Sequence, residues 1–140
     1  MRVLLSIQRI GHHCYKKNIP LVPKLITYLI RLVFGCYIPS ELNLPSSTIL
    51  AYGAIGIVIH KNCKIGERCH IGQNVTLGGS TKDQLVPVLS DDVYIGAGAK
   101  ILGGVNLGES AIVGANAVVI KDVPAKSTAV GVPARSLYHD

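Results

Sequence analysis

The sequence predicts a mainly-β fold, a left-handed parallel β-helix preceded by a short helical segment. Three observations predict it: aliphatic residues recur at every sixth position, small residues keep fixed places between them, and the composition is unusual. The 140 residues include 15 glycines, one phenylalanine and no tryptophan, so Ile, Val, Leu and Ala must fill the core. A period of six fits neither an α-helix nor a two-faced strand, but it fits a solenoid of short flat faces.

The repeat runs from residue 59 to residue 123 with one interruption. Its aliphatic positions are Ile59, Ile65, Ile71, Leu77, Leu89, Ile95, Ile101, Leu107, Val113 and Val119. Four residues after most of these come small or aliphatic side chains: Cys63, Cys69, Val75, Val93, Ala99, Val105, Ala111, Ala117 and Val123. Glycine directly follows most of the aliphatic residues, which suits a tight turn. Three such units predict one triangular coil.

One interruption and one offset mark the irregular parts of the solenoid. Asp83 breaks the aliphatic series within the polar segment 80–88, which we expect to protrude as a loop. Before residue 59 a weaker frame is offset by three residues, and it consists of Ile38, Leu44 and Leu50. This frame predicts an irregular first coil with a bulge near 56–58. We therefore expect a β-helix domain over 38–140, in which residues 125–140 cap the open end.

Residues 1–37 are predicted to form an N-terminal amphipathic helical segment. Aliphatic residues recur there at helical spacing. The first 40 residues hold six Lys or Arg and no Asp or Glu, whereas the remaining 100 hold eight of each sign, so the net charge of +6 lies entirely in the first part. Two interpretations stay open: the helices pack on the first coil or a neighbouring subunit, or they rest on a membrane surface.

Composition also excludes several classes of protein. Nucleic acid is not an expected partner, because no aromatic platform or known module accompanies the basic residues. The most apolar window, 21–38, contains Lys24 and Arg31 and is a poor candidate for a membrane span. No signal peptide is expected, and the four cysteines lack zinc spacing. We expect a cytoplasmic protein with reduced thiols, associated with the inner membrane surface under the second interpretation above.

More than half of the chain resembles the bacterial hexapeptide-repeat acetyltransferases. The matching segments are Gly56-Ile-Val-Ile59, Gln73-Asn-Val-Thr-Leu-Gly-Gly79, Ile95-Gly-Ala-Gly-Ala-Lys-Ile-Leu-Gly103, Val113-Gly-Ala-Asn-Ala-Val-Val-Ile-Lys-Asp-Val-Pro124 and Val130-Gly-Val-Pro-Ala-Arg135. The chain is most similar to the serine acetyltransferases and to their relatives in capsule, exopolysaccharide and O-antigen clusters. The resemblance implies a homotrimer with parallel axes, acetyl-CoA in the groove between subunits, and direct acetyl transfer to an acceptor hydroxyl.

Two departures from the serine acetyltransferases bear on the acceptor. Tyr52 and Gly53 stand where those enzymes carry an Asp-His pair, and Val86 stands where they carry a second histidine before a proline. We therefore predict an acetyl-CoA-dependent O-acetyltransferase that modifies a sugar hydroxyl of a surface polysaccharide or its precursor. The alternatives are a serine O-acetyltransferase of cysteine biosynthesis with an altered site, and a non-catalytic β-helix that serves as a binding or assembly module.

Histidine is the residue type best suited to remove the acceptor proton near neutral pH. His60 follows Ile59 at a position where other units have glycine, so we expect its imidazole to project outward toward a neighbouring subunit and act as the general base. The alternative is a turn histidine in contact with solvent or a partner chain. Tyr52 is the second catalytic candidate, through a hydrogen bond to the acceptor or by stacking. Surface, interface or tail roles are expected for His12, His13, His70 and His139.

Glycine turns and small residues are the candidates for binding the thioester. Gly78 and Gly79 are predicted to stabilise the oxyanion through backbone N–H groups, unless they only permit the turn. By resemblance, the acetyl-CoA groove is lined by Ala97, Gly98 and Ala115. Lys121 and Arg135 are candidates for its phosphates, the alternative being a solvated surface.

We expect no metal site. A zinc site of the β-helical carbonic anhydrase kind needs three histidines, and only His60 and His70 are suitably placed. Cys63 and Cys69 occupy small inward positions, so they are predicted to be packed core residues and not nucleophiles.

Overall fold

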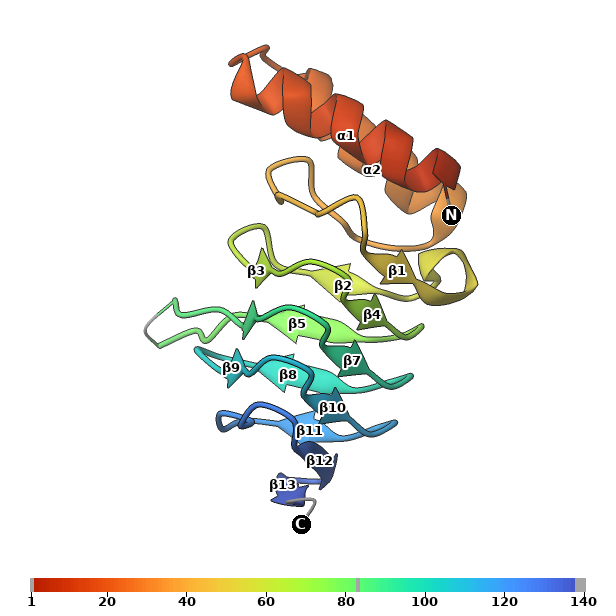
Figure 1. The fold of residues 1–140 in the computed structure, drawn as a ribbon. Helices are drawn as coiled ribbons and strands as arrows, with labels where there is room; N and C mark the ends of the chain where they lie inside the picture. The colour runs from red at the N-terminus through yellow and green to blue at the C-terminus, as the bar shows by residue number, and fades with distance from the viewer. Residues whose placement is uncertain (1, 83, 138–140) are drawn as a thin grey trace.

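A computed structural model describes residues 2–82 and 84–137 and confirms the predicted fold class, a left-handed parallel β-helix with two N-terminal helices (Figure 1). Helix α1 covers Arg2–Lys16 and helix α2 covers Val22–Phe34. The strands are β1 (Ile49–Leu50), β2 (Val58–Ile59), β3 (Lys64–Ile65), β4 (His70–Ile71), β5 (Thr76–Gly78), β6 (Val88–Leu89), β7 (Tyr94–Ile95), β8 (Lys100–Leu102), β9 (Asn106–Leu107), β10 (Ile112–Val113), β11 (Val118–Val119), β12 (Thr128–Gly131) and β13 (Ala134–Leu137). The predicted frame break at Asp83 and the terminal His139 lie outside the described residues.

Three sheets form the faces of the prism. Face A consists of β2, β5, β8 and β11, and face C consists of β3, β6 and β9. Face B consists of β1, β4, β7 and β10, followed by β12 and the antiparallel β13, which turns back at the C-terminal end. Tyr94 pairs in parallel with Ile112, its equivalent one regular coil later. The turns after β2, β5, β8 and β11 form corner AC, and the turns after β1, β4, β7 and β10 form corner BA.

The predicted aliphatic frame is the core of the solenoid. All ten of its residues from Ile59 to Val119 are buried, none of them more than 8% exposed. The small residues four positions later are buried as well, and so are Ile38, Leu44 and Leu50 of the weaker frame. Burial of one such aliphatic side chain stabilises a fold by about 1.5–3 kcal/mol, so the stacked layers are the main favourable term.

The bulge of the first coil lies earlier than predicted. Ile49 pairs with His70, three positions farther than a regular coil requires, which agrees with the predicted offset. The bulge near 56–58 was a wrong prediction, because the structure places it in a 3-10 turn, η1 (Ala51–Ala54). Tyr52 and Gly53 have positive φ angles of 47° and 67° there. The sequence frames show how many residues are extra, but not where they leave the coil.

The two helices form a hairpin that covers the N-terminal end of the solenoid (Figure 1). Gln8 Nε2 donates a hydrogen bond to the Leu42 carbonyl at 2.9 Å, and the Ser40 N–H donates to Thr27 Oγ1 at 3.0 Å. A Cβ on Gly11 would lie 2.3 Å from Ser40 Oγ, so α1 lies directly against the first coil. Within the described part of the chain, neither helix has the length and apolar character needed to cross a membrane.

Candidate active site

His60 lies at corner AC, directly after β2, and is half-buried. Its backbone N–H donates to the Leu77 carbonyl at 2.9 Å, so the main chain stays in the regular ladder. The equivalent position in the next coil is Gly78, because Ile59 pairs with Leu77. Because Gly78 has no side chain, it leaves room for the His60 imidazole in the coil before it. This explains why histidine fits at a turn position that holds glycine in most other units.

The loop at 79–87, which joins β5 to β6, forms a cavity with His60. This cavity has a volume of about 400 Å³ and is lined by His60, Lys61, Asn62, Gly79, Ser80, Thr81 and Gln84. The His60 Cδ2 atom lies 3.6 Å from the position that a Cβ on Gly79 would take. Lys64 pairs with Val88, which is six positions farther along the chain than a regular coil requires. These six extra residues leave the coil and form the loop. The extra residues open the stacked turns at this corner into a pocket beside His60.

The hydrogen bond of the His60 ring decides where its proton lies. The Asn62 backbone N–H is 3.2 Å from His60 Nδ1. Because a backbone N–H can only donate, Nδ1 is the acceptor, and the neutral ring carries its proton on Nε2. To remove a proton from a substrate, Nε2 must first be free of its own proton, which requires the tautomer protonated on Nδ1. In that tautomer Nδ1 no longer accepts the hydrogen bond from the Asn62 N–H.

The two predicted oxyanion glycines differ in their surroundings. Gly79 lines the cavity beside His60 and is exposed. Gly78 belongs to β5, and its carbonyl accepts a hydrogen bond from the Gly103 N–H at 2.9 Å. Of the two, Gly79 is the one that lines the cavity beside the imidazole.

Tyr52 and the predicted acetyl-CoA residues lie on corner BA. Tyr52 is 81% exposed on η1. Ala97 and Gly98 follow β7, and Ala115 follows β10 in the next coil. The Asn116 N–H donates to the Ala97 carbonyl at 2.8 Å, which joins these turns into one column. Figure 1 shows the β1–β2 turn and the β5–β6 loop on opposite sides of the solenoid, so one chain does not bring Tyr52 and His60 together.

The two predicted phosphate-binding cations lie close together. Lys121 and Arg135 both line a cavity of about 530 Å³ at the C-terminal end of the solenoid. Lys121 is on corner AC after β11, and Arg135 is on β13, where it pairs with Val130. The predicted site residues therefore lie along the two edges of face A, with Tyr52 and the small residues on one edge and His60 and Lys121 on the other.

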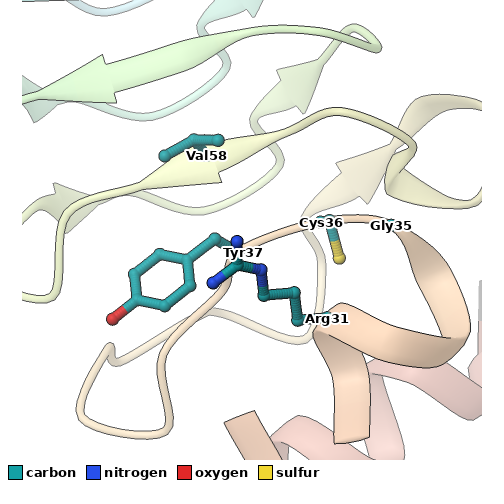
Figure 2. A pocket seen from close by; sticks show the side chains of 5 residues that line it. All are labelled: Arg31, Gly35, Cys36, Tyr37 and Val58. Atoms are coloured by element: carbon teal, nitrogen blue, oxygen red, sulfur yellow. The ribbon is translucent and has the colours of Figure 1, made fainter. Parts of the chain in front are cut away.

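Another cavity, of about 410 Å³, lies where α2 meets the first coil (Figure 2). Figure 2 shows Arg31, from the last turn of α2, extending toward Tyr37, with Cys36 to the right of Tyr37 and Val58 above it. Sequence reasoning missed this cavity, since it joins a helix to strand positions of two different coils, and no local pattern reports such a contact. Burial raises the pKa of the Cys36 thiol to about 11, so it stays protonated near neutral pH and is a poor nucleophile.

Packing roles are seen for His12, His70 and Cys63. His12 Nδ1 lies 3.0 Å from the Ser40 carbonyl oxygen under the hairpin. On face B, the ring centroids of His70 and Tyr94 are 4.8 Å apart. Burial raises the pKa of Cys63 to about 11, as expected for a core thiol. Among residues 2–82 and 84–137, no group of three or more His, Cys, Asp or Glu side chains is arranged to hold a metal ion.

Comparisons with known proteins agree with the sequence motifs. The family described as bacterial transferase hexapeptide (six repeats) matches residues 87–121. A serine acetyltransferase of Synechococcus elongatus is 38% identical over 136 residues, which are 96% of this chain and 55% of that protein. One from Helicobacter pylori is 34% identical over 138 residues, which cover 97% of this chain and 80% of that protein. The chain thus spans about half the length of some relatives and most of another.

Solved structures give the same result. A serine acetyltransferase in complex with cysteine superposes with a TM-score of 0.91 at 34% identity, covering 98% of this chain and 54% of that one. A serine acetyltransferase in complex with CoA superposes with a TM-score of 0.88 at 34% identity, covering 96% and 55%. These matches confirm the resemblance stated from the motifs. They contradict the predicted polysaccharide acceptor, because these relatives act, by name, on serine.

Proposed function

Because the chain belongs to the serine acetyltransferase family of hexapeptide-repeat proteins, we propose that it transfers an acetyl group from acetyl-CoA to the hydroxyl of serine. The acceptor oxygen bonds to the thioester carbonyl carbon, the C–S bond breaks, and the sulfur of CoA leaves with a proton. The observation that carries the proposal is the position of His60. His60 lines a cavity on an edge of face A, next to segments that carry the family motifs.

In this proposal His60 handles the acceptor proton at Nε2. Loss of the hydrogen bond from the Asn62 N–H accompanies the change of tautomer and costs about 0.5–1.5 kcal/mol. That cost is small beside general-base help of about 10²–10⁴-fold in rate. Gly79 supplies a backbone donor for the negative charge that develops on the thioester oxygen.

The proposed donor is acetyl-CoA, and the chain offers groups of the right chemistry for it. Lys121 and Arg135 supply two cations in one cavity, which suits phosphate groups. Ala97, Gly98 and Ala115 present small side chains and backbone along corner BA, where the amide-bearing pantetheine arm can lie. No metal is part of the proposed reaction.

The proposed active unit is a homotrimer. Tyr52 and His60 lie on opposite edges of face A, so a complete site needs corner BA of one chain beside corner AC of the next. Such a head-to-tail contact is heterologous, and it closes into a ring when the rotation between copies is regular. Three copies with parallel axes therefore give three equivalent sites. We place this trimer in the cytoplasm, with residues 1–37 in contact with the inner membrane surface.

Release of the CoA thiol in the presence of L-serine tests the proposed reaction. Wild-type protein is expected to release thiol from acetyl-CoA only when serine is added, and His60→Ala to lose about 10²–10⁴-fold in turnover. His60→Gln, which keeps an N–H donor but cannot take a proton, is expected to lose as much. The matched control is His70→Ala, which removes an imidazole on face B.

Three results would count against the proposal. Full activity of His60→Ala would exclude the imidazole from the reaction. Retained activity of His60→Gln would make His60 a hydrogen-bond donor instead of a base. Absence of both thiol release and acetyl-CoA binding in the wild-type protein would favour the non-catalytic alternative.

A further inference from the structure

Helix α2 has two apolar faces, and only one of them is covered. Its inner face buries Pro23, Thr27 and Ile30 against α1 and the first coil. Its outer face carries Leu25, Tyr28, Leu29, Leu32 and Val33, at the spacing of one side of a helix. Leu32 is 86% exposed and Leu25 is 64% exposed, which is unusual for five large apolar side chains in a row along one helix.

The first 40 residues, which include this outer face, carry only basic charges. The six Lys and Arg side chains of the first 40 residues are all exposed, and they are Arg2, Arg9, Lys16, Lys17, Lys24 and Arg31. No acidic residue occurs among these 40 residues. The exposed side of α1 adds Val3 and Ile10, which are apolar, to its cations. Glu41 of the first coil lines a cavity with Lys24, so one carboxylate lies beside the hairpin. An apolar stripe on a hairpin with six cations is the pattern of helices that lie in the interface of an anionic bilayer.

Charge argues against a second copy of this chain as the occupant. If two such hairpins met, they would bring twelve cations together against the two Glu41 carboxylates that lie beside the hairpins. Like charges at an interface cost several kcal/mol, whereas an anionic lipid surface attracts each of them. The apolar side chains then enter the acyl region while the lysine and arginine heads stay among the headgroups.

We infer that the outer face of α2, together with the exposed cations of the α1–α2 hairpin, is a docking surface for anionic lipid bilayers. The hairpin caps one end of the solenoid, away from corners AC and BA of the later coils (Figure 1). A bilayer therefore contacts the end of the prism and leaves the candidate active site open. In the trimer proposed above, parallel axes place three hairpins in one plane, and this raises the avidity of docking. Only this step of the inference rests on the proposed trimer.

Sedimentation with vesicles tests this docking on the full chain. Vesicles of phosphatidylcholine with phosphatidylglycerol are compared with vesicles of phosphatidylcholine alone, at low and high salt. Wild-type protein is expected to bind the anionic vesicles and to be released by salt. Leu25→Ser combined with Leu32→Ser is expected to bind at least about tenfold more weakly, because two anchors are lost. Arg9→Gln combined with Lys24→Gln is expected to lose about fivefold for each cation.

The matched control removes two exposed apolar side chains from the opposite end of the solenoid, Val132→Ser with Leu137→Ser, and is expected to bind like the wild type. Thermal unfolding of every variant checks the fold, and thiol release checks the active site separately. Equal binding to neutral vesicles, or no binding to either kind, would overturn the inference. A change of oligomeric state in the Leu25/Leu32 variant, with vesicle binding unchanged, would assign the face to a second copy and overturn it too.

Discussion

Truncation of one core layer gives a quantitative prediction about the solenoid. Ile95 is fully buried and pairs with Ile71 in the coil before it and Val113 in the coil after it. The backbone ladders hold these layers about 4.8 Å apart, so the neighbours cannot collapse into the space that Ile95→Ala leaves. Loss of a buried isoleucine side chain at such a site costs about 2–5 kcal/mol of unfolding free energy.

The comparison for this prediction is an outward isoleucine on the adjacent strand of the same face. Ile112 pairs with Tyr94 and is 42% exposed, so Ile112→Ala is expected to cost less than about 1 kcal/mol. For a chain of this length each kcal/mol lowers the melting temperature by roughly 3–4 °C. Thermal melts followed by circular dichroism should therefore separate the two variants by roughly 10 °C. Equal destabilisation, or a larger effect at Ile112, would refute the inward and outward assignment on which the prism is built.

Three further predictions concern turns, packing and thiols. Gly72→Ala should destabilise the protein by about 1–3 kcal/mol in urea titrations, because its Cβ would lie 2.6 Å from the Ala97 backbone nitrogen. Gly11→Ala should loosen the hairpin, since its Cβ would overlap Ser40 Oγ, and hydrogen exchange should rise in α1 before it rises in the β-helix. The raised pKa of Cys63, about 11 against 9.0 unfolded, favours the folded state below pH 9 and loses this effect as pH rises toward 11, so Cys63→Ala should flatten the alkaline fall in stability.

The repeat could be predicted from the sequence because each coil reports its own register. The ten aliphatic residues of the frame, from Ile59 to Val119, are buried in the core, and the offset between Leu50 and Ile59 already indicates three extra residues. The position of His60 at an outward corner also followed from the frame. These features depend on local periodicity, which a single sequence displays directly.

Contacts between distant segments could not be predicted in the same way. The cavity beside His60 depends on how loop 79–87 folds back, and the frame gives only the length of that loop. The tautomer of His60 depends on one backbone N–H, that of Asn62. The hydrogen bonds that seat the hairpin, such as that from Ser40 to Thr27, join residues with no shared pattern. Such contacts are set by tertiary packing, which sequence periodicity does not encode.

The acceptor was the largest error, and its cause is specific. From the sequence, absence of the Asp-His pair at Tyr52 and Gly53 predicts a change of substrate. The close match to serine acetyltransferases at 34–38% identity instead favours the same acceptor with a rearranged base. In the trimer that we propose, the imidazole of His60 from a neighbouring copy serves the position that Gly53 leaves without one.

Complementation between two inactive chains tests the shared site most directly. His60→Ala removes the imidazole from corner AC, and Ala115→Trp blocks the groove on corner BA of the same chain. Each variant alone should release thiol from acetyl-CoA with serine at no more than about one hundredth of the wild-type rate. Trimers assembled from an equal mixture should recover about one quarter of the wild-type rate, because about one interface in four pairs two intact edges. No recovery in mixed trimers would contradict a site built from two copies.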